Sequence, residues 1–378
     1  MTRRWRSSPR PVRAVCLFVA AVPVAGLFLL CGAAHAADLF QLSSDEAGAL
    51  FDKAKPAVVR VRSGDTGVPN AGTGFFVDNQ GTVLTSSSIL VDNSAARVVI
   101  NGVEMDARIL GNDPRSGLAM LHVDYGATAA LPLAHASSLE SGEGVMVVGF
   151  PLNLPVAPSQ GPVSGFEINY LAKVDDTLAP KGSVAAVERF ATTHIHANVA
   201  ISPGQVGSPV LNSHGEVVGL VETSPDDGRS IYALPVEAIT KIMGDFAQYG
   251  RAKHGWVGVN VAAAADTQHD NRTVRVVEVV PGSPASEDSA IRPGDILMRI
   301  DSREIYRPAD VLDASFFSQV GGSMTVVVRR DDKLYSFSFP VVERPVTSAP
   351  AISTHAIVKG ASAAPTPNHV AADPAVAH

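Results

Sequence analysis

The stretch Ile201–Leu220 reads ISPGQVGSPVLNSHGEVVGL, a loop rich in glycine and proline followed by a strand-like run. Gly204, Gly207 and Pro209 fit a tight loop, because glycine reaches backbone conformations that other residues rarely adopt. At the centre of the loop stands Val206, whose side chain has no atom that can attack a substrate or carry a proton. The stretch therefore predicts the shape of a functional loop without its chemistry.

Short apolar runs, separated by glycine, proline and asparagine, surround this stretch between residues 56 and 246. The run AVVRVRS (57–63) alternates apolar and polar residues, and Asn101-Gly102 is a common hairpin turn. Many short strands with this punctuation predict an all-β barrel or sandwich. Apolar residues at helical spacing over Pro235–Gly250 predict a helix that closes this region.

A second region, 255–344, contains further strand-like runs and one helix-like stretch, RPADVLDASFFSQVGG (307–322). About ninety residues suit one small domain. We therefore expect a first domain at 45–250 and a second domain at 255–344. The remaining stretch, 345–378, is rich in Ala, Pro and Thr, and we expect it to be disordered because it buries too little apolar surface.

Residues 1–36 have the organisation of an export signal. Five arginines precede an apolar run that ends in the small-residue site Ala34-His35-Ala36. We expect cleavage after Ala36 and a periplasmic or secreted mature chain. The alternative is an uncleaved anchor, because Ala14–Ala34 has about the length that spans a bilayer.

Composition limits the chemistry of the mature chain. Both cysteines, Cys16 and Cys31, lie in the predicted signal, which excludes disulfides and thiol catalysis after cleavage. The signal carries five positive charges and no negative one, so its removal takes the net charge from −7 to −12. Such an acidic exported protein is a poor candidate for nucleic-acid binding, and we expect no cofactor.

The order of the motifs resembles the HtrA/DegP family of exported trypsin-like serine proteases with a C-terminal PDZ domain. Three stretches are similar to the family segments that hold the catalytic histidine, aspartate and serine: GTGFFVDNQGTVLT (72–85), ARILGNDPRSGLAMLHV (107–123) and residues 195–220. HGWVGVNV (254–261) is similar to the loop and first strand of a PDZ domain. The resemblance implies a mostly β chain, with a trypsin-like double β-barrel followed by one PDZ domain.

The resemblance places Ser88, Gly117 and Val206 at the positions of the catalytic histidine, aspartate and serine. A triad needs a hydroxyl nucleophile, a base and a carboxylate that orients the base. All three groups are replaced, so we expect a pseudoprotease. The resemblance then implies a chaperone, adaptor or regulator of envelope protein quality control that binds polypeptide C-termini or unfolded proteins.

PDZ domains bind chain ends by adding a strand to a sheet edge. The resemblance assigns eight residues to this groove: Trp256, Val257, Gly258, Val259, Val261, Val311, Leu312 and Ser315. For Val257, Val259 and Val311, plain core packing is the alternative. The family's trimers also imply contacts by Phe40, Leu42, Leu50 and Phe51, and either a homo-trimer or a mixed oligomer with an active paralogue.

Two other functions stay open from the residues. One is a serine endopeptidase that uses displaced groups, with Ser208 as the nearest hydroxyl in the loop and His122, His194, His196 or His214 as a relocated base. The other is a metal-binding barrel, because His194 and His196 would share one face of a strand. A polar strand face is the simpler explanation for the two histidines.

Overall fold

The structure, a computed structural model, describes residues 44–64, 70–90, 95–126, 129–135, 139–167, 192–224, 226–263, 274–287 and 290–345. The predicted signal peptide and the predicted tail after Pro345 lie outside these residues. By its internal contacts the chain divides into two units. The described parts of Met1–Ile109, Leu121–Phe166 and Ile195–Glu237 form the first unit, and those of Leu110–Met120, Glu167–His194 and Ala238–His378 form the second. None of the helices in the described ranges has the length and hydropathy needed to cross a bilayer.

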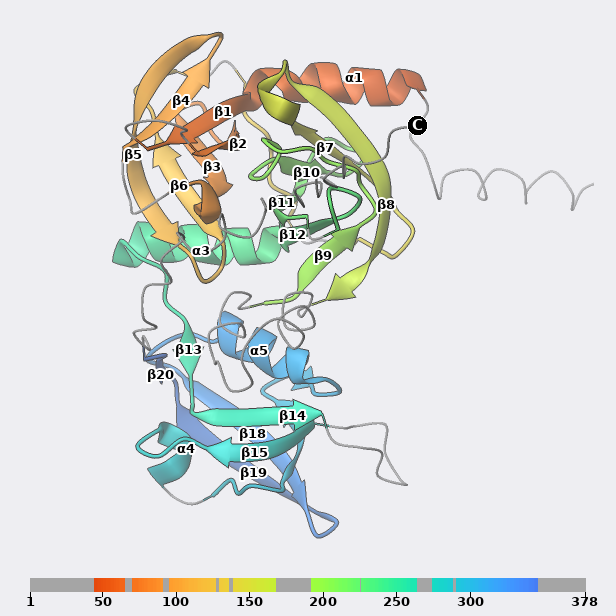
Figure 1. The fold of residues 1–378 in the computed structure, drawn as a ribbon. Coiled ribbons are helices and arrows are strands. Elements are labelled where there is room, and N and C mark those ends of the chain that lie inside the picture. Colours follow the sequence, from red (N-terminus) through yellow and green to blue (C-terminus); the bar gives the residue numbers. More distant parts are fainter. Residues whose placement is uncertain are drawn as a thin grey trace, which may run out of the picture. The chain divides into compact units, whose positions relative to one another are not determined.

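Six strands close the first barrel in the order β1-β2-β3-β6-β5-β4 (Figure 1). The hairpin predicted at Asn101-Gly102 joins β4 to β5, and both residues have positive φ, at 51° and 81°. Two short helices accompany these strands, α1 (Ser44–Ala54) and the 3₁₀ turn η2 (Lys55–Ala57). The strands are β1 (Val58–Ser63), β2 (Asn70–Phe76), β3 (Thr82–Ser86), β4 (Ala96–Ile100), β5 (Val103–Asp113) and β6 (Leu118–His122).

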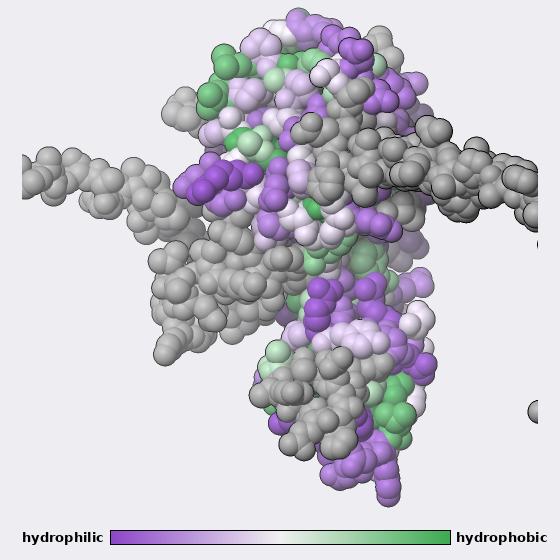
Figure 2. Space-filling view, turned by 90° about the vertical axis from the view of Figure 1, so that its right-hand side faces the viewer, coloured by the Kyte–Doolittle hydropathy of each residue, from purple (hydrophilic) through white to green (hydrophobic). Residues whose placement is uncertain are grey.

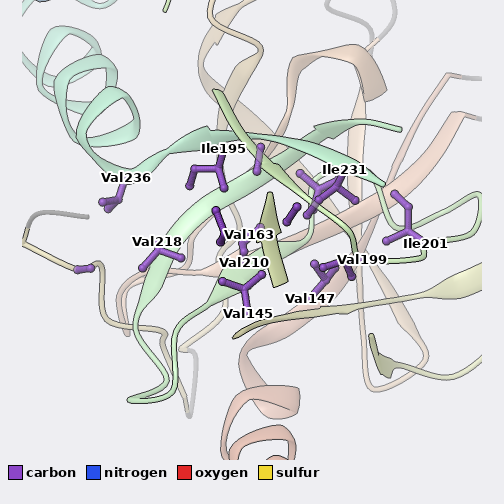
Figure 3. Close-up of a cluster of buried hydrophobic side chains, with 14 residues drawn as sticks. Val145, Val147, Val163, Ile195, Val199, Ile201, Val210, Val218, Ile231 and Val236 are labelled. Carbon is purple, nitrogen blue, oxygen red and sulfur yellow. The ribbon is translucent and has the colours of Figure 1, made fainter. Parts of the chain in front are cut away.

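The second barrel has the order β10-β11-β12-β9-β8-β7. Its inward residues are aliphatic, and Figure 3 shows Val147, Val210 and Ile231 among the side chains that meet inside it. Burial of such side chains drives the closure, because each contributes about 1.5–3 kcal/mol when it leaves water. The strands are β7 (Gly144–Gly149), β8 (Ala157–Glu167), β9 (His194–Ala197), β10 (Pro209–Leu211), β11 (Val217–Thr223) and β12 (Ile231–Pro235).

The helix predicted after the strands is α3 (Val236–Tyr249), and Gly250 follows it with a φ of 70°. Its apolar positions Ile239, Ile242 and Phe246 are buried, as the helical spacing predicts. The ring of Phe246 lies against the backbone of Gly111 so closely that a Cβ at residue 111 would overlap it.

After α3 the chain forms a further sheet, separate from the two barrels, with the order β14-β15-β16-β18-β19 and with β17 paired to β16. Two short strands, β13 and β20, pair with each other outside that sheet. The elements are β13 (Gly255–Trp256), β14 (Val259–Ala263), β15 (Val274–Val279), α4 (Pro284–Glu287), β16 (Ile296–Ile300), β17 (Arg303–Glu304), α5 (Pro308–Phe317), β18 (Ser323–Arg330), β19 (Lys333–Pro340) and β20 (Val342–Glu343). The predicted helix at 307–322 is thus the shorter α5.

The predicted fold class is confirmed: the chain is mostly β, with two six-stranded barrels and a C-terminal PDZ-type sheet. Large exposed apolar side chains are spread over several elements, among them Leu152, Val277 and Leu334. On the face in Figure 2, hydrophilic residues separate small hydrophobic patches. Scattered single apolar residues of this kind need no special explanation.

Candidate functional sites

Thr73 on β2 fixes the shape of the loop that carries Val206. Its backbone N–H donates to the carbonyl of Val206 over 2.8 Å, and its hydroxyl donates to the carbonyl of Gly204 over 2.8 Å. The N–H of Phe150 in turn donates to the same hydroxyl over 3.1 Å. Gly204 and Gly207 have φ values of +97° and +85°, which explains why glycine stands there. The predicted tight loop is therefore present.

The turn that carries Ser88 lies beside this loop. Ser88 sits in the 3₁₀ turn η3 (Ser87–Ile89), and its hydroxyl pairs with that of Ser86 over 2.8 Å. A Cβ built on Gly207 would lie 3.0 Å from the backbone nitrogen of Ser86, which shows how closely turn and loop approach. Val206 is half-buried there, and Ser88 is exposed. The two serine hydroxyls are thus bonded to each other, and the residue at the centre of the loop, Val206, has no polar side-chain group.

Ser208, the hydroxyl that the endopeptidase alternative would use, is fully buried, with 0% of its surface exposed. Its hydroxyl oxygen has no hydrogen-bond partner among the described residues. The hydroxyl lies against β7 so closely that a Cβ on Gly149 would overlap it. A peptide bond in solvent cannot reach this oxygen without rearrangement of the loop.

Gly117 lies in the second unit and is buried in the turn between β5 and β6. Its φ is +81°, and its N–H donates to the carbonyl of Asp113 over 2.9 Å. Its structural role is the turn itself, because residues with side chains rarely adopt this backbone conformation.

Three of the four histidines that could act as bases have ring contacts elsewhere, and the fourth, His214, donates its backbone N–H to the Oδ1 of Asn212 over 3.0 Å. His122 bonds Asp124 over 3.2 Å, and the Nδ1 of His194 lies 2.8 Å from the carbonyl of Thr192. His196 stacks on Tyr232 with ring centroids 4.7 Å apart. None of these partners is a serine hydroxyl. Within the described ranges, no three histidine, cysteine, aspartate or glutamate side chains gather as a metal site would require.

The predicted peptide-binding residues lie around one narrow cavity of about 40 Å³ in the second unit. Seven of the eight line it, and Val261 does not. Core packing also accounts for the valines: Val257 is a buried core residue, and Val259, Val261 and Val311 pack against the same core. The full lining is Trp256, Val257, Gly258, Val259, Leu297, Ile300, Val311, Leu312, Ser315, Met324, Val326 and Arg344.

Two carbonyls of the 256–259 loop fix the direction of the N–H groups in the same peptide units. The carbonyls of Val257 and Gly258 accept from the N–H groups of Ala285 and Val280, over 2.9 and 2.8 Å. In a planar trans peptide the N–H points opposite to its carbonyl. The N–H groups of Gly258 and Val259 are therefore directed away from those partners. Gly258 has a φ of +87°, and a Cβ there would overlap Ser283.

Helix α5 is fastened to the start of this loop. The hydroxyl of Ser315 donates to the carbonyl of Gly255 over 2.6 Å, and Ser318 donates to the carbonyl of Ser315 over 2.7 Å. A side chain on Gly255 would overlap the Ser318 hydroxyl. Ser315 is therefore held between the helix and the loop, where its role is to keep the cavity walls in place.

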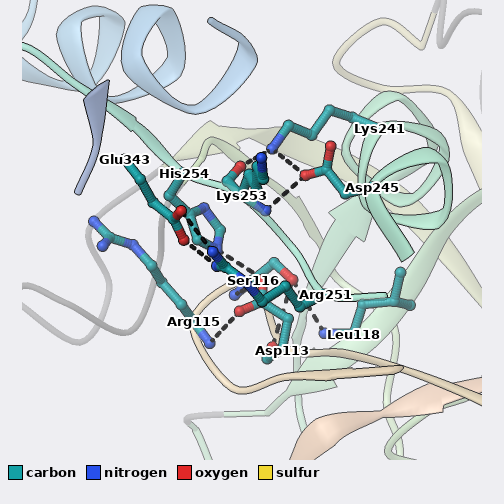
Figure 4. A network of polar contacts seen from close by, with 10 residues as sticks. All are labelled: Asp113, Arg115, Ser116, Leu118, Lys241, Asp245, Arg251, Lys253, His254 and Glu343. Atoms are coloured by element: carbon teal, nitrogen blue, oxygen red, sulfur yellow. Dashed lines mark hydrogen bonds and ion pairs between the residues drawn. The ribbon is translucent and has the colours of Figure 1, made fainter. Parts of the chain in front are cut away.

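A polar network precedes the loop (Figure 4). The Nε2 of His254 lies 3.0 Å from Asp113, and Ser116 donates its N–H to the same carboxylate over 3.2 Å. Burial of Asp113 raises its pKa, but the bonds from His254 and Ser116 outweigh burial and lower the pKa below its ordinary value. Arg251 pairs with Glu343 through both guanidinium nitrogens. These side-chain contacts join His254 to Asp113 and Arg251 to Glu343.

Sequence reasoning missed Arg344 and the cavity floor formed by Leu297, Ile300, Met324 and Val326. Met324 and Val326 alternate on β18, so that pattern could have indicated them. Leu297 and Ile300 are three residues apart on β16, on either side of an irregularity in its pairing with β18, so alternation could not have indicated both. Arg344 follows β20 and had no local signal, because it reaches the cavity only through the pairing of β13 with β20.

Two family models match the chain: the trypsin-like peptidase domain over residues 72–220 and the PDZ domain over residues 255–341. The serine endoprotease DegS of Escherichia coli is 26% identical over 335 residues, which cover 81% of this chain and 89% of DegS. The chain thus has the HtrA-type arrangement, a trypsin-like peptidase domain followed by a PDZ domain. A Hahella chejuensis protein named as a probable periplasmic serine endoprotease, DegP-like, is 28% identical to this HtrA-type chain and matches 72% of it.

Solved structures give the same fold for this HtrA-type chain. The HtrA-type protease AlgW with tripeptide superimposes with a TM-score of 0.65 at 21% identity, covering 79% of this chain and 97% of that one. The match with the Hahella protein covers 57% of that protein's length, and the match with HhoA of Synechocystis covers 62%. The chain therefore spans less than two thirds of these two curated relatives.

Proposed function

We propose that this HtrA-type chain is an exported protein without peptidase activity that binds polypeptide C-termini or unfolded segments. The observation that carries the proposal is the contrast between its two sites. The loop around Val206 keeps its shape and presents an isopropyl group, while seven predicted peptide-binding residues line one cavity. Loss of a triad serine costs about 10⁶ in turnover in a comparable protease. The function that remains in this proposal is the binding of polypeptide segments.

The buried position of Ser208 supports the absence of a displaced nucleophile. Its hydroxyl is 0% exposed and packs against Gly149. The imidazole contacts of His122, His194 and His254 go to Asp124, the Thr192 carbonyl and Asp113. Acyl transfer needs a hydroxyl in reach of a base, and these contacts supply no such pair.

Two assays on the purified mature chain test the proposal. We expect no labelling by a fluorophosphonate probe and no cleavage of casein, and we expect the single variant Val206→Ser to stay inactive because it restores no base. Binding of peptides with aliphatic C-termini should be measurable by the fluorescence of Trp256, the one tryptophan after the predicted signal. Casein cleavage that Ser208→Ala abolishes would contradict the proposal and support the endopeptidase alternative.

The named relatives suggest where this chain acts. A periplasmic location agrees with the name of the Hahella relative, a probable periplasmic serine endoprotease, and a part in envelope protein quality control belongs to our proposal. Cleavage after Ala36 and a homo-trimer, or a mixed oligomer with an active paralogue, belong to the same proposal. Leu50 is 7% exposed and Phe51 is half-buried in α1, and Phe40 and Leu42 lie outside the described residues. N-terminal sequencing and light scattering of the exported protein test these points.

A further inference from the structure

The first unit contains a cavity of about 380 Å³ that neither Val206 nor Ser88 lines. Its wall is mostly aliphatic and aromatic, and the side chains in it include Val58, Phe76, Val99, Ile100, Phe150 and Val156. Two lining residues are cations, Lys55 and Arg60, and none of the described lining residues is acidic. Small-molecule sites in proteins have this size and this combination of an apolar wall with a few polar groups.

Arg60 on β1 is held in a fixed position at the wall of this cavity. Its Nη2 donates to the carbonyls of Asn153 and Leu154, over 2.7 and 3.2 Å. The guanidinium carbon lies 4.9 Å from the centroid of the Phe150 ring, a cation–π contact. Because the guanidinium is already ordered, it loses little conformational freedom when it binds a ligand.

The charge of Arg60 is not balanced by an acid in the way that its neighbours' charges are. Lys55 pairs with Asp52 over 2.6 Å, and Arg62, two residues along β1, lies 3.8 Å from Glu104. Within the described ranges no carboxylate bonds Arg60, and its Nε is buried without a hydrogen-bond partner. Burial, and next the charge of Arg62, lower the pKa of Arg60 below its ordinary value. An anion beside the guanidinium would offset both effects.

The wall of the cavity favours an alkyl chain over a peptide as the body of the ligand. A peptide brings an N–H and a C=O group with each residue, and each of these groups needs a partner when it leaves water. Apart from the two cations, only Asn101 and Tyr125 among the described lining residues have polar side-chain atoms. An alkyl chain needs no such partners, and its transfer from water to an apolar wall is favourable by itself.

We infer that this cavity binds a medium-chain fatty acid, with its alkyl chain against the apolar wall and its carboxylate on the Arg60 guanidinium. A carboxylate on an arginine makes charge-assisted hydrogen bonds, which are roughly twice as strong as neutral ones. The cavity shares no lining residue with the peptide-binding cavity of the second unit. The inference is therefore independent of the proposed peptide binding.

The test is isothermal titration calorimetry of the purified mature chain with octanoate, octanol and acetate at neutral pH. Arg60→Met removes the charge and keeps a long apolar side chain. Val99→Phe narrows the cavity without a change in charge, because Val99 is a half-buried lining residue. Arg108→Met is the matched control, since Arg108 is an exposed arginine on β5 of the same barrel and does not line the cavity.

We expect octanoate to bind about tenfold more tightly than octanol, which has the same chain length and no charge. Acetate, which has the carboxylate and no alkyl chain, should show no measurable binding. Arg60→Met should weaken octanoate to the affinity of octanol and leave octanol unchanged. Val99→Phe should weaken both ligands, and Arg108→Met should weaken neither.

Equal affinities of the wild-type chain for octanoate and octanol, or no binding of octanoate, overturn the inference, and this comparison needs no variant. An octanoate Kd that stays the same in Arg60→Met or in Val99→Phe also overturns it. So does an octanoate Kd that rises with protein concentration, because a second copy of the chain would then cover the cavity. These outcomes leave the proposed peptide binding intact, since its assay uses peptides and the fluorescence of Trp256.

Discussion

At the scale of single residues, the loop around Val206 is held by specific hydrogen bonds and by close packing. Thr73 holds the carbonyls of Gly204 and Val206, and Ser208 fills the space beside Gly149. Any side chain on β7 at residue 149 would compete with Ser208 for that space. Serine at 208 and glycine at 149 are therefore coupled through one small volume of the second barrel.

A pair of substitutions tests this coupling. Gly149→Ala should lower the free energy of unfolding by about 1–3 kcal/mol, because overpacking a tight interior forces side chains from their preferred positions. Adding Ser208→Gly removes the overlapping hydroxyl, so the double variant should be more stable than Gly149→Ala alone. Urea unfolding followed by circular dichroism gives the three values.

The control for that pair is Gly144→Ala. Gly144 lies on the same strand, and a Cβ there meets nothing within 4 Å. Gly144→Ala should lower the free energy of unfolding less than Gly149→Ala does, by a difference of at least about 1 kcal/mol. Equal losses for the two alanine variants, or no gain on adding Ser208→Gly, would show that the hydroxyl is not the obstacle.

At the scale of elements, helix α3 is stabilised by its buried face. Phe246 is 5% exposed and packs on Gly111, so the helix depends on a contact with the end of β5. Phe246→Ala should reduce the free energy of unfolding of the second unit by about 3–5 kcal/mol through loss of burial and a new cavity. Urea titration of the mature chain measures it.

Gln248→Ala is the matched change on the exposed side of the same helix. It should alter the free energy of unfolding by no more than about 0.5 kcal/mol, because surface substitutions away from special features change little. If Phe246→Ala falls within that range as well, the contact of the helix with Gly111 does not contribute to stability.

The elements also show how far the sequence determines the result. Alternation, the Asn101-Gly102 turn and the helical spacing before Gly250 predict the strands, the hairpin and α3, because each pattern acts over neighbouring residues. The contacts that shape the sites join distant residues. Ser208 with Gly149, and Arg344 with the loop at 256–259, depend on strand pairing across sixty to ninety residues, and no local pattern records it.

At the scale of the whole molecule, two groups of titrating side chains act in different pH ranges. Asp113 and Glu343 have pKa values lowered by their partners, although burial opposes the shift. Their stabilisation is complete above the ordinary carboxyl pKa of about 4 and is lost below it. His194 affects folding stability at higher pH than these carboxylates do. It is fully buried, and burial lowers its pKa from 6.5 to about 4, against the opposing effects of the Thr192 carbonyl and Asp313.

This difference predicts the pH profile of folding stability. Between pH 6.5 and 4 the unfolded chain protonates His194 while the folded chain does not, so the unfolded state binds more protons and stability falls as pH falls. The loss over this window should be about 3 kcal/mol, from a shift of about 2.5 pH units. His194→Gln should remove that slope, because glutamine does not titrate. His196→Gln, two residues along β9, should leave it in place. A profile that is as steep in His194→Gln as in the wild-type chain would mean that the acid sensitivity of this protein arises from other groups.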